Sequence, residues 1–223
     1  MPSTGKADPS PAPGQPLSQV VKSPIHFGTA GWRGLIARDF TFENVRLAAQ
    51  GLALHLKGEL RRKTSPLHGR KPLIIIGHDT RFLGREFALA TAEILTQNGL
   101  EPLLCNRDAP TPVLAFSIRR LKTIGGVNIT ASHNPFGWSG FKYSMPNGAG
   151  APREVTGKIE AHVEKLLAKS WPPKSAVVGP FQCRTFDPRP AYLKRIRQLV
   201  DLRAIGRAKL KIAVELMHGT GRG

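Results

Sequence analysis

Apolar residues in the middle of the chain follow two alternating patterns. Short continuous apolar runs beside glycine or proline are typical of strands buried on both faces, as in a parallel sheet. Between these runs, apolar residues recur every three or four positions, as on the buried face of a helix. The pattern predicts strands at 73–77, 102–105 and 125–129 and helices at 41–63, 87–98, 112–122 and 157–169. Such alternation predicts an α/β fold with a mostly parallel sheet.

Local signals mark the ends of two of these helices. Thr41 precedes the first, and its hydroxyl can accept a hydrogen bond from an N–H group of the first turn. The run Arg61-Arg62-Lys63 ends that helix, where cations meet the negative end of the helix dipole. Gly99 follows the second helix as its C′ residue.

Composition divides the chain into four parts. The first part is rich in Pro, Ser and Gly and cannot bury enough apolar surface to fold. The third contains five prolines and few periodic positions. The fourth holds a basic helical stretch at 192–205, a stop at Gly206 and an apolar run at 210–216 that predicts a strand. The predicted parts are a disordered tail (1–24), a first α/β domain (25–170), a linker (171–190) and the incomplete start of a second α/β domain (191–223).

The charge of the chain points to an anionic partner. The 223 residues carry a formal net charge of +18, which suits nucleic acid, a membrane surface or phosphorylated small molecules. The excess is spread out, with net +8 in residues 25–150 and net +9 in residues 151–223. A basic arm would instead concentrate the charge at one end.

Other compositional features limit the class of protein. No apolar run reaches the roughly 18 residues of a membrane span, and the N-terminus has no apolar signal core, so we expect neither a membrane span nor a secretory peptide. Cys105 and Cys183 lie far apart without metal-ligand spacing. Their pattern excludes a disulfide scaffold and suits a reducing cytoplasm, which we expect as the location.

The segment Thr130-Ala131-Ser132-His133-Asn134-Pro135 follows a predicted strand directly. Ligands of open α/β sheets bind beyond the carboxyl ends of strands, so a serine beside a histidine there is a candidate nucleophile. The alternative is an ordinary turn in which Ser132 and Asn134 bond to their own backbone. The residue pattern alone leaves both readings open. A hydrolase-type serine is disfavoured, because no Gly-x-Ser-x-Gly motif is present.

Three further segments carry candidate chemistry. In Phe27–Gly34, three glycines allow close backbone approach and Arg33 could bind a phosphate, or the segment is a glycine-rich turn with a surface arginine. Asp79 and Arg81 follow a strand and favour an ion pair that shapes the loop. Lys142, in Ser-Gly-Phe-Lys, could assist proton transfer or contact a phosphate, or it is a solvated surface lysine.

In their order along the chain, these segments resemble the α-D-phosphohexomutase superfamily, in its phosphoglucomutase/phosphomannomutase branch. The hexapeptide Thr-Ala-Ser-His-Asn-Pro is highly specific, and the segment Phe-Gly-Thr-x-Gly-Trp-Arg-Gly supports it independently. The resemblance runs from about Ile25 to the C-terminus. It implies a three-layer α/β/α domain with a mostly parallel sheet, followed by the start of a second α/β domain.

The resemblance also implies roles for individual residues. Ser132 is similar to the active-site serine, carried as phosphoserine, which gives its phosphoryl group to a hexose phosphate to form a 1,6-bisphosphate. The other phosphate of that intermediate then returns to the serine. His133 matches a residue that positions the phosphate or a proton. Lys142 matches a residue that acts as a general acid or base. Arg33 matches an arginine near the phosphoserine. A dianionic phosphoserine needs such a cationic surround.

The sequence departs from the family pattern in one important respect. The family's metal loop, Asp-x-Asp-x-Asp, supplies carboxylates to Mg²⁺, and the six aspartates here show no such spacing. The family's sugar-recognition and phosphate-binding loops are also absent from this sequence. The phosphate on Ser132 would be the only family ligand for Mg²⁺ in this chain. We therefore expect the N-terminal part of a phosphohexomutase, as a fragment, a truncated gene product or half of a split protein, with little or no turnover alone. In the split-protein case its partner is the missing C-terminal domains as a separate chain.

An alternative from another class is a non-catalytic module whose basic surface binds nucleic acid or an acidic partner. The helical stretch at 192–205 carries Lys194, Arg195, Arg197 and Arg203. These cations are not confined to one face, which is typical of a solvated helix. The sequence contains no ribonucleoprotein motif, zinc finger or basic zipper, so a nucleic-acid partner is disfavoured.

Overall fold

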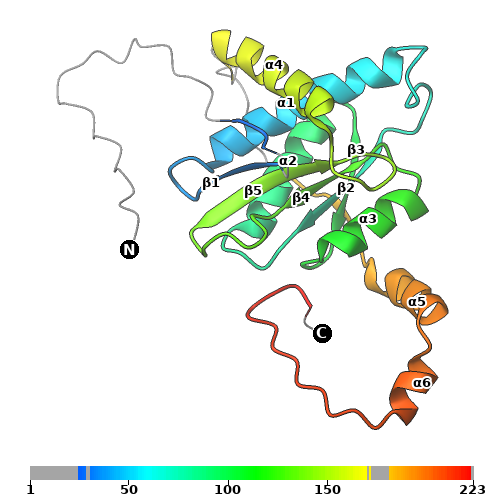
Figure 1. The fold of residues 1–223 in the computed structure, drawn as a ribbon. Coiled ribbons are helices and arrows are strands. Elements are labelled where there is room, and N and C mark those ends of the chain that lie inside the picture. The colour runs from blue at the N-terminus through cyan, green and yellow to red at the C-terminus, as the bar shows by residue number, and fades with distance from the viewer. Residues whose placement is uncertain (1–24, 29–30, 170, 172–180, 222–223) are drawn as a thin grey trace, which may run out of the picture.

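A six-stranded sheet forms the centre of the computed structural model, which describes residues 25–28, 31–169, 171 and 181–221 (Figure 1). The predicted disordered tail, 1–24, lies outside the described residues. In spatial order the strands are β1 (Trp32–Leu35), β5 (Trp138–Ser144), β4 (Gly126–Ile129), β2 (Leu73–His78), β3 (Glu101–Cys105) and β6 (Arg184–Phe186). The four strands β4, β2, β3 and β6 are parallel, whereas β5 and β1 add an antiparallel edge.

Helices cover both faces of this sheet, as the α/β prediction requires (Figure 1). On one face α1 packs against α2 and α4, and on the other α3 packs against β2 and β4. The alternation along β2 shows why its sequence is continuously apolar. Ile74 and Ile76 join the core under α1 and α2, and Ile75 joins the core under α3. The helices around the sheet are α1 (Phe42–Arg61), α2 (Gly84–Gln97), α3 (Thr111–Arg120) and α4 (Arg153–Ala168).

The predicted helix signals are largely confirmed. Thr41 caps α1, because its hydroxyl accepts the N–H of Asn44 at 3.2 Å. Gly99 follows α2 with φ +77°, a left-handed conformation that glycine adopts without strain. The helix α2 begins at Gly84, three residues before its predicted start, after Leu83 in a left-handed conformation.

Three strands were not predicted. In β1, buried Trp32 and Gly34 alternate with half-buried Arg33 and Leu35, so the segment has no continuous apolar run. The strand β5 contains the Ser-Gly-Phe-Lys segment that sequence analysis treated only as a candidate site. The three-residue β6 lies inside the segment predicted to be a linker, and it pairs with β3.

The C-terminal part differs from its prediction. The single helix predicted at 192–205 is two helices, α5 (Arg189–Leu199) and α6 (Leu202–Arg207). Asp201 separates them, because its carboxylate caps α6 by accepting the N–H groups of Arg203 and Ala204. The strand predicted at 210–216 is wrong for this structure: the segment is exposed and has no strand neighbour within the described residues. An apolar run becomes a strand only where a partner satisfies its backbone.

No helix in the described ranges is both long and apolar enough to cross a bilayer.

Candidate active site

A cleft of about 760 Å³ opens beyond the carboxyl ends of the parallel strands. Its walls come from the loops that follow β2, β3 and β4 and from the C-terminal residues 217–220. This edge is where open α/β sheets bind their ligands. Ser132 and His133, both exposed, lie on the wall that follows β4.

The loop after β4, residues 130–137, is here called the serine loop. Ser132 adopts φ +58°, a left-handed conformation uncommon for a residue with a side chain. The turn is closed by other groups: the Thr130 hydroxyl accepts the N–H of Ser132 at 3.0 Å, and the Ala131 carbonyl accepts the N–H of Asn134 at 3.2 Å. The Ser132 hydroxyl has no hydrogen-bond partner among the described residues, so it is available to a ligand in the cleft.

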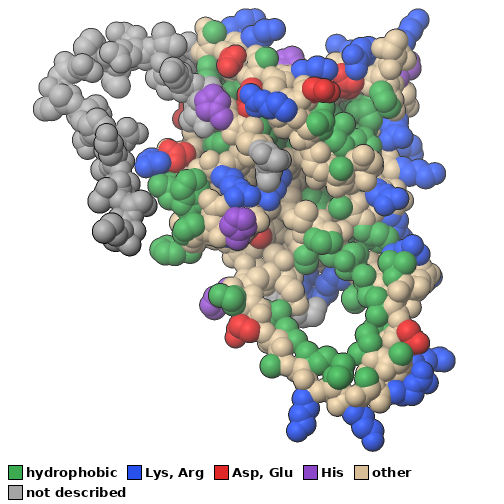
Figure 2. Space-filling view, viewed as in Figure 1, with side chains coloured by type: hydrophobic (Ala, Val, Ile, Leu, Met, Phe, Trp, Pro, Cys, Tyr) green, Lys and Arg blue, Asp and Glu red, His purple; other side chains and the backbone are tan. Residues whose placement is uncertain are grey.

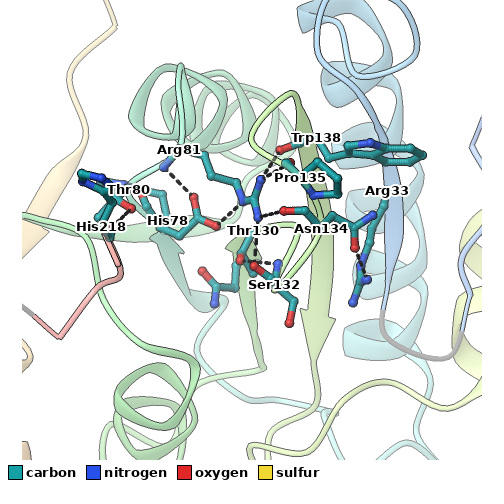
Figure 3. Close-up of polar contacts among 12 residues, drawn as sticks. Arg33, His78, Thr80, Arg81, Thr130, Ser132, Asn134, Pro135, Trp138 and His218 are labelled. Carbon is teal, nitrogen blue, oxygen red and sulfur yellow. Dashed lines mark hydrogen bonds and ion pairs between the residues drawn. The ribbon is translucent and has the colours of Figure 1, made fainter. Parts of the chain in front are cut away.

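The guanidinium of Arg81, from the loop after β2, holds the serine loop in place (Figure 3). It donates hydrogen bonds to four backbone carbonyls of that loop and of the first residue of β5. These carbonyls belong to Ser132, Asn134, Pro135 and Trp138, at 2.9, 2.6, 2.7 and 3.0 Å. Because the donor is charged and largely buried, these bonds are stronger than neutral ones. One side chain therefore fixes the path of the backbone from Ser132 to Trp138.

Asp79 orients that guanidinium. Its carboxylate lies 3.3 Å from Nε of Arg81 and also accepts the Arg81 backbone N–H at 2.9 Å. The predicted Asp79–Arg81 pair is confirmed. Sequence analysis did not predict that Arg81 also binds the serine loop, which lies more than fifty residues further along the chain. The strand order could have indicated this contact, because the carboxyl ends of neighbouring parallel strands meet at one edge of the sheet.

Arg33 contacts the serine loop from the other side. Its Nη1 donates to Oδ1 of Asn134 at 2.6 Å, so the Asn134 side chain does not close its own turn (Figure 3). Gly140 pairs with Arg33 across β1 and β5. A Cβ there would lie 3.1 Å from Cγ of Arg33 and 2.5 Å from the Thr130 carbonyl oxygen, so the close packing at this position favours glycine. In the part of the chain that is described, the rest of the guanidinium has no protein partner, which leaves donors for an anion.

Lys142 is a half-buried cation on the same face of the sheet. It pairs with Asn128 of β4 and lies two residues from Gly140, so its side chain shares the face of Arg33. Burial lowers the pKa of the Lys142 ammonium, the charge of Arg33 lowers it further, and Asp79 partly offsets both. A lysine with a lowered pKa is a better proton acceptor near neutral pH than a solvated one.

The four predicted site residues thus lie near the same edge of the sheet, but only two of them line the cleft. Ser132 and His133 line the cleft, whereas Arg33 and Lys142 lie beside it on the sheet. Asn128 was not predicted. It is buried and lines the cleft, and its amide nitrogen donates to the Thr111 hydroxyl at 3.1 Å. Its Oδ1 has no hydrogen-bond partner among the residues that the structure describes.

The described residues do not fit a Mg²⁺ site. They contain no group of three or more His, Cys, Asp or Glu side chains placed to hold a metal ion. Asp79, the carboxylate that lines the cleft, is already paired with Arg81. Mg²⁺ prefers several oxygen ligands in octahedral geometry, and this edge offers the ion too few.

We expect Arg81→Lys to loosen the serine loop, because an ammonium cannot reach four carbonyls at once. The predicted loss of unfolding free energy is about 2 kcal/mol, with faster amide hydrogen exchange confined to the serine loop and the start of β5. Chemical denaturation and exchange mass spectrometry measure both. The matched control is Arg85→Lys, at an exposed position in α2, which should change stability by less than about 0.5 kcal/mol. Equal exchange in the two variants would contradict the role of Arg81.

Comparison with known proteins places this geometry in a family context. A family model described as "Phosphoglucomutase/phosphomannomutase, alpha/beta/alpha domain I" matches residues 24–169. A phosphoglucomutase of Staphylococcus haemolyticus is 31% identical over 210 residues, which are 91% of this chain and 36% of that protein. The chain therefore spans little more than a third of the length of such relatives.

Solved structures show the same relation. A Thermus thermophilus protein assigned as a phosphomannomutase superposes with a TM-score of 0.67 at 37% identity, over 81% of this chain and 37% of that one. The Paramecium phosphoglucomutase pp63/parafusin in its open form superposes with a TM-score of 0.64 over 82% of this chain and 36% of that one. At 21% identity, the second comparison supports the fold alone.

Proposed function

The chain belongs to the phosphoglucomutase/phosphomannomutase family, and on that premise we propose that Ser132 carries the phosphoryl group of a hexose-phosphate mutase. The observation that supports this most is the state of Ser132. Its hydroxyl is exposed at the cleft and unused by the turn, while its backbone is fixed by Arg81. A nucleophile needs such a free side chain on a rigid support.

The proposed reaction transfers a phosphoryl group between the serine and a hexose phosphate. In the loading direction, Oγ of Ser132 attacks a phosphorus atom of a hexose 1,6-bisphosphate. The P–Oγ bond forms, the bond from phosphorus to the sugar oxygen breaks, and the serine proton passes through a base to that sugar oxygen. In the reverse direction, phosphoserine gives its phosphoryl group to the free hydroxyl of a hexose monophosphate. A transfer in each direction, at C1 and at C6, isomerises the substrate.

We assign the surrounding residues to charge stabilisation and proton transfer. Phosphoserine carries a charge of about −1.5 to −2, and Arg33 and Lys142 are the cations on the adjacent face of the sheet. Lys142, whose pKa is lowered, can exchange a proton with the reacting oxygens. His133, exposed beside Ser132 on the cleft wall, helps to position the phosphate. Catalysis of this kind depends on positioning and electrostatics.

The described residues do not supply every group that a complete mutase cycle needs. No Asp-x-Asp-x-Asp spacing occurs in the sequence, and the described residues hold no metal-binding cluster. Recognition of the sugar and of its distal phosphate would also need surfaces beyond the cleft. We therefore propose that this polypeptide accepts a phosphoryl group on Ser132 but turns over hexose phosphates slowly or not at all.

Incubation with glucose 1,6-bisphosphate should add one phosphoryl group to the protein at Ser132. Intact-mass analysis and peptide mapping measure the addition and its site. Ser132→Ala should remove the signal, because the attacking oxygen is gone. The control Thr64→Ala, which deletes an exposed hydroxyl after α1, should leave it unchanged. Phosphate mapped to another residue, or retained in Ser132→Ala, would refute the assignment.

Mutase turnover of the purified chain should be at or near the background of a coupled assay. The assay supplies glucose 1-phosphate, a bisphosphate primer and Mg²⁺ and detects glucose 6-phosphate. Turnover at the roughly 1–1,000 s⁻¹ of ordinary enzymes would show that the missing carboxylates are not required.

Phosphorylation of Ser132 should raise the pKa of Lys142. A nearby dianion favours the protonated ammonium, which opposes the lowering caused by burial and by Arg33. NMR titration of the lysine side chain in the free and phosphorylated proteins measures the shift. In the unphosphorylated protein the lowered pKa also means that the folded state binds the proton less tightly than the unfolded state. The free energy of unfolding therefore increases as the pH rises from the pKa of Lys142 in the folded state towards 10.5, its value in the unfolded state. An unchanged or lower pKa after phosphorylation would place Lys142 away from the phosphate.

A further inference from the structure

Residues 25–28 precede β1, and the helix α4 holds them by their backbone. The carboxylate of Glu160 accepts the N–H of Phe27 at 2.6 Å, and Nη1 of Arg153 donates to the Phe27 carbonyl at 3.1 Å. The same Nη1 also donates to Oε1 of Glu160 at 2.6 Å. Both backbone polar groups of Phe27 are therefore paired with one ion pair of α4. We call this pair, Arg153 and Glu160, the α4 clamp.

The position of the α4 clamp on its helix explains how it reaches Phe27. Its two residues are seven positions apart, so two helical turns place them on one face of α4. The helix itself packs against α1, which fixes it on the domain. Burial raises the pKa of Glu160, but the hydrogen bonds from Arg153 and Phe27 outweigh burial and lower it. The carboxyl group is therefore ionised at neutral pH.

The contacts of Arg153 set it apart from the other exposed cations of the chain. Figure 2 shows Lys and Arg side chains spread over the visible surface, so an exposed arginine alone would indicate nothing. The Arg153 side chain is mostly exposed too, but its guanidinium binds both Phe27 and Glu160. It therefore has a structural partner on each side.

Phe27 transmits this restraint towards the site through two contacts. Its ring packs edge-on against Phe141 of β5, with the ring centroids 6.2 Å apart. The next residue, Gly28, exchanges two backbone hydrogen bonds with Gly31, at 3.1 and 3.3 Å. The register of β1 with β5 then puts Gly31 opposite Lys142.

The side chain of Lys142 crosses the space above Gly31. A Cβ at Gly31 would lie 2.6 Å from Cγ of Lys142, so any side chain there would displace the lysine. The Lys142 ammonium has no hydrogen-bond or ion-pair partner among the described residues, so packing sets where it lies. The burial that accompanies this packing is the main cause of the lowered pKa of Lys142.

We propose that Arg153 and Glu160 are positioning residues for Lys142: by holding Phe27 they keep Gly31 opposite the lysine and so fix the path of its side chain. The functional part of this proposal rests on the proton-transfer role proposed for Lys142, whereas the structural part does not. Without the α4 clamp, both backbone groups of Phe27 lose their partners, and the segment that packs on Lys142 moves away. Water then reaches the ammonium, which favours its protonated form.

NMR titration of the Lys142 side chain tests the α4 clamp in the folded protein. Glu160→Ala removes the acceptor of the Phe27 N–H and should raise the pKa of Lys142 from its lowered value towards 10.5. Loss of a carboxylate would by itself lower the pKa of a lysine, so a rise reports a change of position. Glu164→Ala, at an exposed glutamate one turn further along α4, is the matched control and should leave the pKa unchanged.

A reversed ion pair separates the backbone contact from the charge pair. The double variant Arg153→Glu/Glu160→Arg keeps both charges on α4 but sets a donor against the Phe27 N–H, so it should also raise the pKa of Lys142. A loss of stability alone would leave that pKa unchanged in the folded state. If Glu160→Ala does not fold, Glu160→Gln replaces it. The amide oxygen of Gln still accepts the Phe27 N–H without the charge, and a smaller rise is expected.

The rate at which glucose 1,6-bisphosphate phosphorylates Ser132 provides a second readout. It should fall roughly tenfold in Glu160→Ala and stay unchanged in Glu164→Ala, because only the first change displaces Lys142. A wild-type chain that is not phosphorylated would refute the proposed function and with it the functional part of this inference, while the pKa comparison would still decide the structural part. An equal pKa of Lys142 in the wild type, in the Glu160 variant and in the reversed pair would overturn the inference.

Discussion

The contact between the Arg81 guanidinium and the four carbonyls of residues 132–138 determines the geometry of this site. It joins the end of β2 to the turn between β4 and β5, and Asp79 fixes its direction. Because the backbone is held from inside the turn, the Ser132 hydroxyl faces the cleft and the Asn134 side chain reaches Arg33. The strand that follows places Lys142 on the same face. A single positive charge thus holds the serine loop in place.

Much of the fold was predictable because its signals are local. The strands β2, β3 and β4 are buried on both faces and therefore read as continuous apolar runs. The antiparallel edge was missed because β1 alternates buried and half-buried residues and its glycine and arginine serve close packing and the site. The opposite error occurred at 210–216, where an alternating apolar pattern has no partner within the described chain. Pattern shows that a strand can form, but pairing decides whether it does.

The site followed from a different kind of information. Ser132, His133, Lys142 and Arg33 were identified by family resemblance, and the structure brings them to one edge without testing their roles. The contacts that shape the edge join residues far apart in sequence, such as Arg33 and Asn134, 101 positions apart. No local pattern encodes such a contact. Residues 24–169 show the membership of the family, and the chain spans little more than a third of the length of such relatives.

The most direct test of this account compares the rate at which hexose 1,6-bisphosphate phosphorylates Ser132 in the wild-type chain and in Arg81→Lys. Neither Ser132 nor the cations Arg33 and Lys142 are altered by that change, so only the support of the loop differs. If Arg81 positions the nucleophile, the rate should fall roughly tenfold or more. Equal rates in the two proteins would show that the reactivity of Ser132 does not depend on the backbone contact from which this account starts.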